Sequence, residues 1–211
     1  MWFEVRECTQ AGCAFRFPVD PLVEDRPVCP LCGAPLKMAG VYPAGLPEED
    51  GETGRLSTSL IGVLDNLRSA FNVGSILRIA DGVGMAGLHL CGITPTPENP
   101  KVAKTALGAE AAVAWDYHRN ALHAVAQLQA EGVRLVVLER TVGAVSLFDL
   151  DFRPGVPVAL VVGNEKAGVD PAVRDVADDL AYLPMRGQKE SLNVAVAFGI
   201  ASYILRHLPS V

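Results

Sequence analysis

The sequence predicts a three-layer α/β fold, in which a mostly parallel sheet lies between two sets of helices. Three observations lead to this prediction. From residue 59 onward, strand-like apolar runs alternate with helix-like segments. Two of the runs, VALVV (158–162) and VRLVVL (133–138), are apolar on both faces, as central strands of a parallel sheet are. The 211 residues are 50% hydrophobic, which suits one medium domain plus a small appendage.

The expected strands and helices follow one another along this part of the chain. The last helix is the clearest, because Val194, Phe198 and Leu205 recur at helical spacing. Strands are expected at Leu60–Leu64, Gly87–Cys91, Ala112–Trp115, Val133–Glu139, Val158–Val162 and Leu180–Leu183. Helices are expected at Val73–Asp81, Lys101–Leu107, Asn120–Glu131, Pro171–Ala177 and Leu192–His207.

The first 58 residues differ from the rest in composition. Residues 1–36 contain four of the five cysteines and are too short to form an apolar core. Residues 37–58 are rich in Gly, Pro and acidic residues, which is typical of a linker. We therefore expect a cysteine module at 1–36, a linker at 37–58 and the α/β domain at 59–211.

The four N-terminal cysteines have the spacing of a metal site. They are Cys8, Cys13, Cys29 and Cys32, and the second pair forms the tight knuckle CPLCG. A structural zinc ion takes four thiolate ligands, and a segment this short needs such a staple to fold. The spacing predicts a zinc-ribbon-like module with structural Zn²⁺; four free thiols or a redox pair are the alternatives. Cys91, at the end of a strand, is expected to be a buried apolar side chain.

Charge and hydropathy limit the classes of partner. The formal net charge is −6, which argues weakly against bulk nucleic-acid binding but leaves room for a local basic face. The apolar runs are only strand length and the N-terminus lacks a signal sequence, so we expect no membrane contact and a cytoplasmic location. Candidate cations for a basic face are Arg55, Arg68, Arg78, Arg186 and Lys189, with Arg6, Arg16 and Arg26 in the cysteine module.

One glycine pattern is a false lead. Residues 82–87 match the G-x-G-x-x-G pattern of dinucleotide-binding domains, but a helix precedes these glycines and a strand follows them. This order is the reverse of what the motif requires. A nicotinamide-binding Rossmann domain is therefore disfavoured, and the glycines are expected to cap the helix and form a turn.

Three polar clusters are expected at one edge of the sheet. They follow strands and read DNLRSAFNVGSILR (65–78), GNEKAG (163–168) and LPMRGQKESLNV (183–194). Each cluster alone would indicate only caps and turns. Because ligands of open α/β sheets bind beyond the carboxyl ends of strands, the three together predict a site.

Strings within these clusters carry a family resemblance. NVGSILR (72–78) has an Asn followed six residues later by an Arg, GNEKAG (163–168) follows a buried strand, and LPM (183–185) precedes SLNV (191–194). Their order and distances resemble the three motifs of the SpoU (TrmH-like) family of RNA ribose 2′-O-methyltransferases, within the wider SPOUT class. The resemblance covers about residues 59–208 and leaves out the cysteine module.

The resemblance implies a C-terminal trefoil knot, in which the chain threads through a loop, and a bound S-adenosylmethionine. The loops at 139–146, 163–168 and 183–192 would hold this cofactor. Members of the class are usually homodimers, so the knot and the apolar last helix are expected at a dimer interface. The expected cofactor contacts are Gly163, Leu183, Met185, Ser191 and Leu192.

Catalytic roles are implied as well. Arg78 occupies the catalytic position and would stabilise negative charge on the ribose 2′-oxygen, because a guanidinium is a fixed cation. Asn72 and Asn193 would orient Arg78 and the ribose. Ser191 would assist, or cap the last helix. Glu165 would anchor a loop or pair with an arginine, or be purely structural.

The expected function is therefore transfer of a methyl group from S-adenosylmethionine to a ribose 2′-hydroxyl of structured RNA, either tRNA or rRNA. Two alternatives stay open. One is a SPOUT methyltransferase that acts on an RNA base, which would lack the polar set formed by Asn72, Arg78, Ser191 and Asn193. The other is a non-catalytic module that binds RNA through its cysteine ribbon and keeps S-adenosylmethionine structurally.

Overall fold

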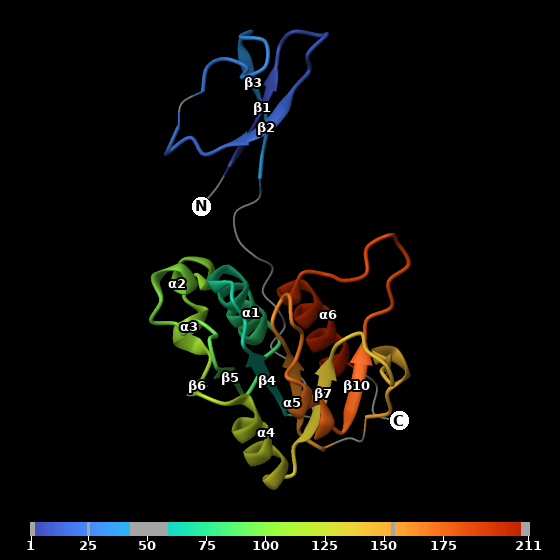
Figure 1. Cartoon of the computed structure of the whole chain (residues 1–211). Coiled ribbons are helices and arrows are strands. Elements are labelled where there is room, and N and C mark those ends of the chain that lie inside the picture. Colours follow the sequence, from blue (N-terminus) through green and yellow to red (C-terminus); the bar gives the residue numbers. More distant parts are fainter. Residues whose placement is uncertain (1–2, 25, 43–58, 153–154, 208–211) are drawn as a thin grey trace. The chain divides into compact units, whose positions relative to one another are not determined.

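The chain contains two compact units. The structure, a computed structural model, describes residues 3–24, 26–42, 59–152 and 155–207, and the boundary between the units falls in residues 43–58, outside the described part. Figure 1 shows the two units, with labels on most of their helices and strands.

The N-terminal unit is a small antiparallel sheet. Its strands are β1 (Glu4–Cys8), β2 (Arg16–Val19) and β3 (Leu36–Val41), in the order β2-β1-β3. Residues 37–41 of the predicted linker therefore lie in β3, because their backbone groups pair with β1. Tyr42 follows β3, and the rest of the predicted linker, residues 43–58, lies outside the described residues.

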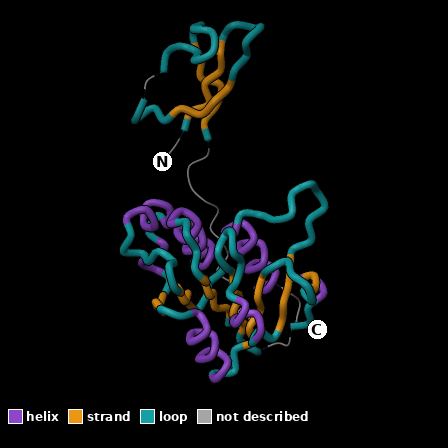
Figure 2. The backbone as a smooth tube through the Cα atoms, in the orientation of Figure 1, coloured by secondary structure: helices purple, strands orange, loops and turns teal. Residues whose placement is uncertain are grey.

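The C-terminal unit is built on a parallel sheet of seven described strands in the order β6-β5-β4-β9-β7-β10-β8. The predicted α/β class with a parallel sheet is confirmed, and the strands are drawn in orange in Figure 2. Their bounds are β4 Leu60–Asp65, β5 Gly87–Cys91, β6 Trp115–His118, β7 Arg134–Leu138, β8 Val145–Ser146, β9 Val158–Val162 and β10 Asp179–Tyr182.

Helices cover both faces of this sheet and produce two cores. Alternate residues of β9 enter each core: Val158 and Leu160 face one, while Ala159 and Val161 face the other. Helices α1, α2, α3 and α6 contribute to the first core, and α4 and α5 to the second. The helices are α1 Ala70–Gly82, α2 Pro100–Ala106, α3 Ala109–Ala112, α4 Ala121–Ala130, α5 Pro171–Asp175, α6 Val194–His207 and the 3₁₀ helix η1 Leu147–Asp149.

One predicted strand is misplaced. The apolar run expected to form a strand at Ala112–Trp115 instead ends the short helix α3, and the strand β6 begins at Trp115. Among the described strands, β6 pairs with β5 alone and forms an edge of the sheet, so its outer residues are polar and give a weak apolar signal. The predicted trefoil knot stays a prediction. None of the helices in the described ranges is long and apolar enough to cross a membrane.

Candidate functional site

A pocket of about 310 Å³ lies where three loops meet, beyond the carboxyl ends of β7, β9 and β10. The loop after β7 contributes Glu139 and Arg140, and the other two loops contribute their polar clusters. This convergence follows from the sheet, because parallel strands present their carboxyl ends at one edge. The pocket brings together all the expected cofactor contacts, namely Gly163, Leu183, Met185, Ser191 and Leu192.

The loop at 163–168 is tight, and its glycines explain why. A Cβ on Gly163 would lie 2.3 Å from the Val169 nitrogen, so the loop's own backbone excludes a side chain there. Gly168 has φ +79°, a left-handed conformation that favours glycine. Backbone hydrogen bonds join Asn164 and Gly168 in both directions, at 3.0 and 2.9 Å. The loop therefore presents Glu165 from a fixed turn.

Glu165 connects this loop to the first polar cluster. One carboxylate oxygen accepts hydrogen bonds from the Ser69 N–H (3.1 Å) and the Asn72 side-chain amide (2.9 Å), and the other accepts from the Arg68 N–H (2.9 Å). The Asn193 amide donates in turn to Asn72 Oδ1 at 3.1 Å. Three motifs that are distant in sequence thus form one hydrogen-bonded network.

The Glu165 carboxylate is held in its ionised form. Partial burial raises its pKa, but the N–H of Arg68 and the other donors outweigh burial, so the pKa lies below its ordinary value. These donors stand at the N-terminus of α1, where a negative charge is favourable. A carboxylate with a low pKa and occupied oxygens is a poor base. The geometry supports the anchoring role expected for Glu165.

Arg78 lies on the exposed side of α1, and its side chain makes no hydrogen bond or ion pair with the described residues. The expected orientation of Arg78 by Asn72 and Asn193 is therefore not seen: the Asn193 amide donates to Asn72, and the Asn72 amide donates to Glu165. Gly74, in the middle of this motif, has a packing role. A Cβ there would lie 2.6 Å from the Val102 carbonyl of α2.

The N-cap of α6 differs from the expected one. Asn193 Oδ1 accepts hydrogen bonds from the Ala195 N–H (2.9 Å) and the Val196 N–H (3.3 Å), so Asn193 is the cap. Ser191 cannot take this role because α6 begins at Val194, three residues later. Ser191 is instead an exposed residue at the pocket.

Two acidic residues of the site were not singled out in the sequence. Asp65 is 1% exposed and accepts hydrogen bonds from the Asn66 amide (2.7 Å) and the Asp170 N–H (2.8 Å). Burial raises the pKa of Asp65, although these donors oppose the rise. Glu139, at the pocket, accepts from the Val169 N–H at 2.6 Å. Both acids stand at or next to a strand's carboxyl end, which was the available signal.

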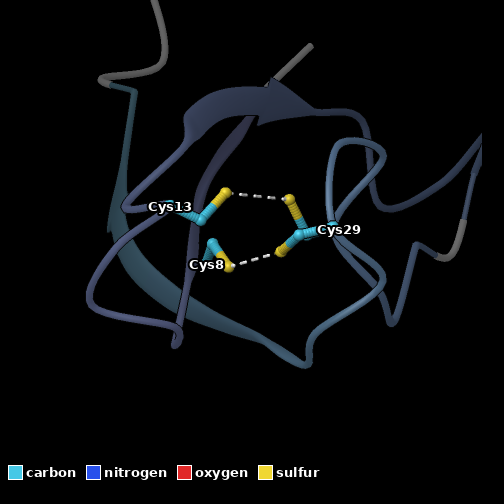
Figure 3. A group of neighbouring side chains, drawn as sticks. Cys8, Cys13 and Cys29 are labelled. Atoms are coloured by element: carbon cyan, nitrogen blue, oxygen red, sulfur yellow. Dashed lines mark hydrogen bonds between the residues drawn. The ribbon is translucent and has the colours of Figure 1, made fainter.

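The four N-terminal cysteines form a cluster in the other unit. Their sulfurs all lie within 4.8 Å of one another, with 3.4 Å between Cys8 and Cys32 and 3.8 Å between Cys13 and Cys29. Figure 3 shows three of these side chains turned toward one another. Four sulfurs around one zinc ion, each about 2.3 Å from it, would stand roughly 3.8 Å apart. The donor set therefore fits tetrahedral zinc.

Comparison with known proteins identifies a family of similar sequences and structures. The SpoU rRNA Methylase family model matches residues 59–203. The chain is 35% identical to the 23S rRNA (guanosine(2553)-2′-O)-methyltransferase RlmP of Bacillus subtilis, over 76% of this chain and 62% of that protein. It is 29% identical to the tRNA (guanosine(18)-2′-O)-methyltransferase of Escherichia coli, over 66% and 59%. An AdoMet-bound rRNA methyltransferase from Sinorhizobium meliloti shares the fold with TM-score 0.67 and 32% identity, over 72% and 57%.

The chain spans about three fifths of the length of these curated relatives. The matched region contains all three polar clusters, and the cysteine cluster lies outside it. Because the family model covers more than half of its residues, the chain belongs to the SpoU rRNA Methylase family.

Proposed function

We propose that this chain transfers a methyl group from S-adenosylmethionine to a ribose 2′-hydroxyl of structured RNA, either tRNA or rRNA. One observation carries the proposal: Glu165 and Asn193 line the pocket, and both hydrogen-bond Asn72 on α1. The proposed cofactor pocket therefore lies directly beside Asn72, a polar side chain that could bind the ribose. The names of the relatives, 2′-O-methyltransferases of rRNA and tRNA, support the same reaction.

The pocket residues fit S-adenosylmethionine. The pocket volume is near the lower end of the range for small-molecule sites, and loop backbone and apolar side chains suit a nucleoside. When bound, S-adenosylmethionine supplies an electrophilic methyl group on a sulfonium. The residues that would hold it are Gly163, Leu183, Met185, Ser191 and Leu192.

The remaining residues would prepare the ribose. Its hydroxyl is a weak acid, so the oxygen needs a nearby cation as its proton leaves. Arg78 supplies a fixed charge that stabilises the developing alkoxide, and the proton of the hydroxyl passes to solvent water. Asn72 and Asn193, fixed by their mutual hydrogen bond, orient the ribose. Glu165 is a positioning residue, because its contacts hold Asn72 and the start of α1.

The test of this function has a binding arm and a product arm. Calorimetry with S-adenosylhomocysteine should find one site per chain that S-adenosylmethionine competes for. Mass mapping of RNA from cells with and without the gene should find a methyl group missing from one ribose. No binding at millimolar ligand contradicts the methyltransferase assignment. A methyl group missing from a base would favour the base-acting alternative, and binding without any missing methyl group would favour the non-catalytic one.

We also propose that Cys8, Cys13, Cys29 and Cys32 hold one structural zinc ion. Support comes from the short sulfur–sulfur distances and from the small number of buried apolar residues around them. All four are free cysteines, so no disulfide competes for them in the structure. A closed tetrahedral site of this kind stabilises a fold and leaves no open position for chemistry.

We further propose that the chain is a homodimer formed through α6. Val196 (51% exposed), Ile200 (41%) and Tyr203 (49%) recur at i, i+4 and i+7, so one apolar stripe of the helix faces outward. Sedimentation should find a dimer for the wild type and a monomer for Val196→Glu. Val176→Glu, at another exposed valine beyond α5, is the matched control. A monomeric wild type would contradict the proposal.

A further inference from the structure

The outer face of α1 carries an exposed aromatic residue, Phe71, that the proposed site does not use. Phe71, Ser75 and Arg78 recur at i, i+4 and i+7, so they share one side of the helix. Phe71 is 54% exposed even though it is an apolar aromatic. A single exposed phenyl ring is ordinary in a soluble protein. Phe71 is of interest because exposed cationic side chains lie near it.

Helix α2 extends this face. α1 packs against α2 on one flank and α6 on the other (Figure 1). The α2 contact is close because Gly74 has no Cβ: one built there would lie 2.0 Å from Thr105 Oγ1. Arg78 follows Gly74 by one helical turn, and Lys101 precedes Thr105 by one turn. Both cations therefore lie beside the helix contact, on the solvent side.

The α1–α2 region is basic in a chain of net charge −6. Residues 66–107 contain four cations and two acids, Asp81 and Glu98. One of these acids, Glu98, already accepts a hydrogen bond from Thr96. The cationic side chains make no hydrogen bond or ion pair within the described part of the chain, and all are exposed. They are Arg68, Arg78, Lys101 and Lys104.

We propose that this α1–α2 face binds the single-stranded RNA that flanks the methylated ribose. The Phe71 ring stacks on an unpaired base, and Arg68, Lys101 and Lys104 contact phosphates. An exposed aromatic ring flanked by cations is the arrangement that single-stranded nucleic acid recognition uses, because every base has a face to stack. The inference rests on the proposed function and deepens it.

Continuity with the proposed site supports this occupant. Phe71 immediately precedes Asn72, whose side chain belongs to the network at the pocket. Arg68 lies at the same end of α1, where its N–H binds Glu165. A strand that places its ribose at Asn72 would pass these side chains first. A second copy of the chain is the competing occupant, and the experiment separates the two.

The first arm of the experiment measures stacking. Fluorescence anisotropy reports binding of a short labelled single-stranded RNA of mixed sequence, and of the same sequence as a duplex. Phe71→Ala should weaken single-strand binding roughly 5- to 150-fold and duplex binding little, since one base–aromatic stack is worth about 1–3 kcal/mol. Phe71→Trp should keep the affinity. Phe148→Ala, which removes an equally exposed ring (60%) on η1, is the matched control.

The second arm measures phosphate contacts. The double variant Lys101→Ala, Lys104→Ala should reduce the slope of log affinity against log salt by about 0.7 per lost contact. Lys37→Ala is the control, because Lys37 already pairs with Glu7 at 3.0 Å. An unchanged slope in the double variant overturns the assignment of these lysines.

Three results would overturn the inference. They are normal single-strand binding by Phe71→Ala, equal losses in Phe71→Ala and Phe148→Ala, and a change from dimer to monomer in Phe71→Ala by sedimentation. The last result would assign the ring to a second copy. A titration with S-adenosylhomocysteine on the same samples separates this inference from the proposed function. Normal cofactor binding with unaltered RNA binding rejects the α1–α2 face alone, whereas no cofactor binding in the wild type rejects the methyltransferase.

Discussion

The two units of the chain hold themselves together in different ways. In the C-terminal unit, two cores on opposite faces of the sheet bury apolar residues from every strand except β6 and β8. In the described part of the N-terminal unit, the buried apolar residues are Cys8, Val19 and Cys29. Two of these three are proposed zinc ligands. The large unit is thus stabilised by packing, whereas in the small unit the proposed zinc ion would take the place of a core.

The units also differ in how their cations are used. Arg6, Arg16 and Arg26 were candidates for an RNA face, but each pairs with a nearby glutamate of its own unit. Cations that are already paired gain less from a phosphate than free ones. The unpaired cations of α1 and α2 are better placed to bind RNA. The N-terminal unit is thus expected to contribute little to the salt dependence of RNA binding.

The largest expected effect is loss of the N-terminal fold without metal. Elemental analysis should find about one zinc per chain, because four thiolates fill one tetrahedral site. Cys29→Ser should lose the zinc and the NMR signals of folded residues 3–42. The melting transition of the C-terminal unit should not change, since its cores contain none of these cysteines.

Cys91→Ser is the matched control for this substitution. Cys91 is fully buried in the second core of the C-terminal unit. The Cys91→Ser protein should keep its zinc and lose stability only in the C-terminal unit. Metal-free protein with intact signals from residues 3–42 would contradict the zinc proposal.

The next largest expected effect is a loss of methylation rate in the large unit without a loss of its stability. Arg78→Ala should slow single-turnover methylation of RNA on the order of 10²–10³-fold, the usual cost of losing one transition-state contact. Affinity for S-adenosylhomocysteine and the melting temperature should not change, because Arg78 is exposed and does not line the pocket. Arg78→Lys should restore little, since an ammonium cannot replace a planar guanidinium.

Arg119, another exposed arginine, provides the control variant Arg119→Ala. Near-normal methyl transfer by Arg78→Ala would overturn the catalytic assignment. Loss of folding in that variant would assign Arg78 to the structure instead.

A third substitution tests whether packing alone holds the large unit. Gly74→Ala should destabilise it by about 1–3 kcal/mol, because the new methyl group would overlap the Val102 carbonyl. The Val102 carbonyl belongs to the backbone of α2, so it cannot rotate away from the new methyl group as a side chain could. Melting curves should show a fall of several degrees, about 2–4 °C per kcal/mol at this size. Gly12→Ala, where no atom lies within 4 Å, should have little effect. An unchanged or higher melting temperature would show that α1 and α2 can move apart to admit the methyl group without a loss of folding free energy.

The sequence was most informative where apolar patterns were strong. The ranges of β5 and β9 were predicted without error, because both strands have a neighbour on each side and carry buried apolar residues. The short elements β8 and α3 were missed and β6 was displaced, since edge strands and single turns have little apolar pattern. The three polar clusters were predicted to lie together: two of them line one pocket, and the first is hydrogen-bonded to that pocket through Asn72.

Contacts within the site could not be predicted in the same way. The bonds of Glu165 to α1 join residues 93 to 97 positions apart, and no local pattern reports such a distance. The cap of α6 was predicted wrongly at Ser191, because serine and asparagine are equally good caps and the choice depends on where the helix begins. The Glu165 contacts and the start of α6 both depend on how the elements pack in three dimensions, which a local sequence pattern does not report.

The smallest expected effect concerns acid stability, and it depends on a histidine pair in the large unit. His89 Nδ1 and His118 Nε2 lie 2.8 Å apart on neighbouring strands. Partial burial and then the neighbouring His118 lower the pKa of His89 below its ordinary value of 6.5, although Asp116 and Glu131 oppose this.

Because the folded protein binds this proton less readily than the unfolded chain, the contribution of neutral His89 to stability is complete above pH 6.5 and declines as the pH falls below it. Melting temperatures measured downward from about pH 7.5 should therefore fall less steeply in His89→Gln than in the wild type. His123→Gln, on the exposed side of α4, should follow the wild type. If the melting temperatures of all three proteins fell in parallel with pH, the histidine pair would not contribute to acid sensitivity. The carboxylates would then account for it.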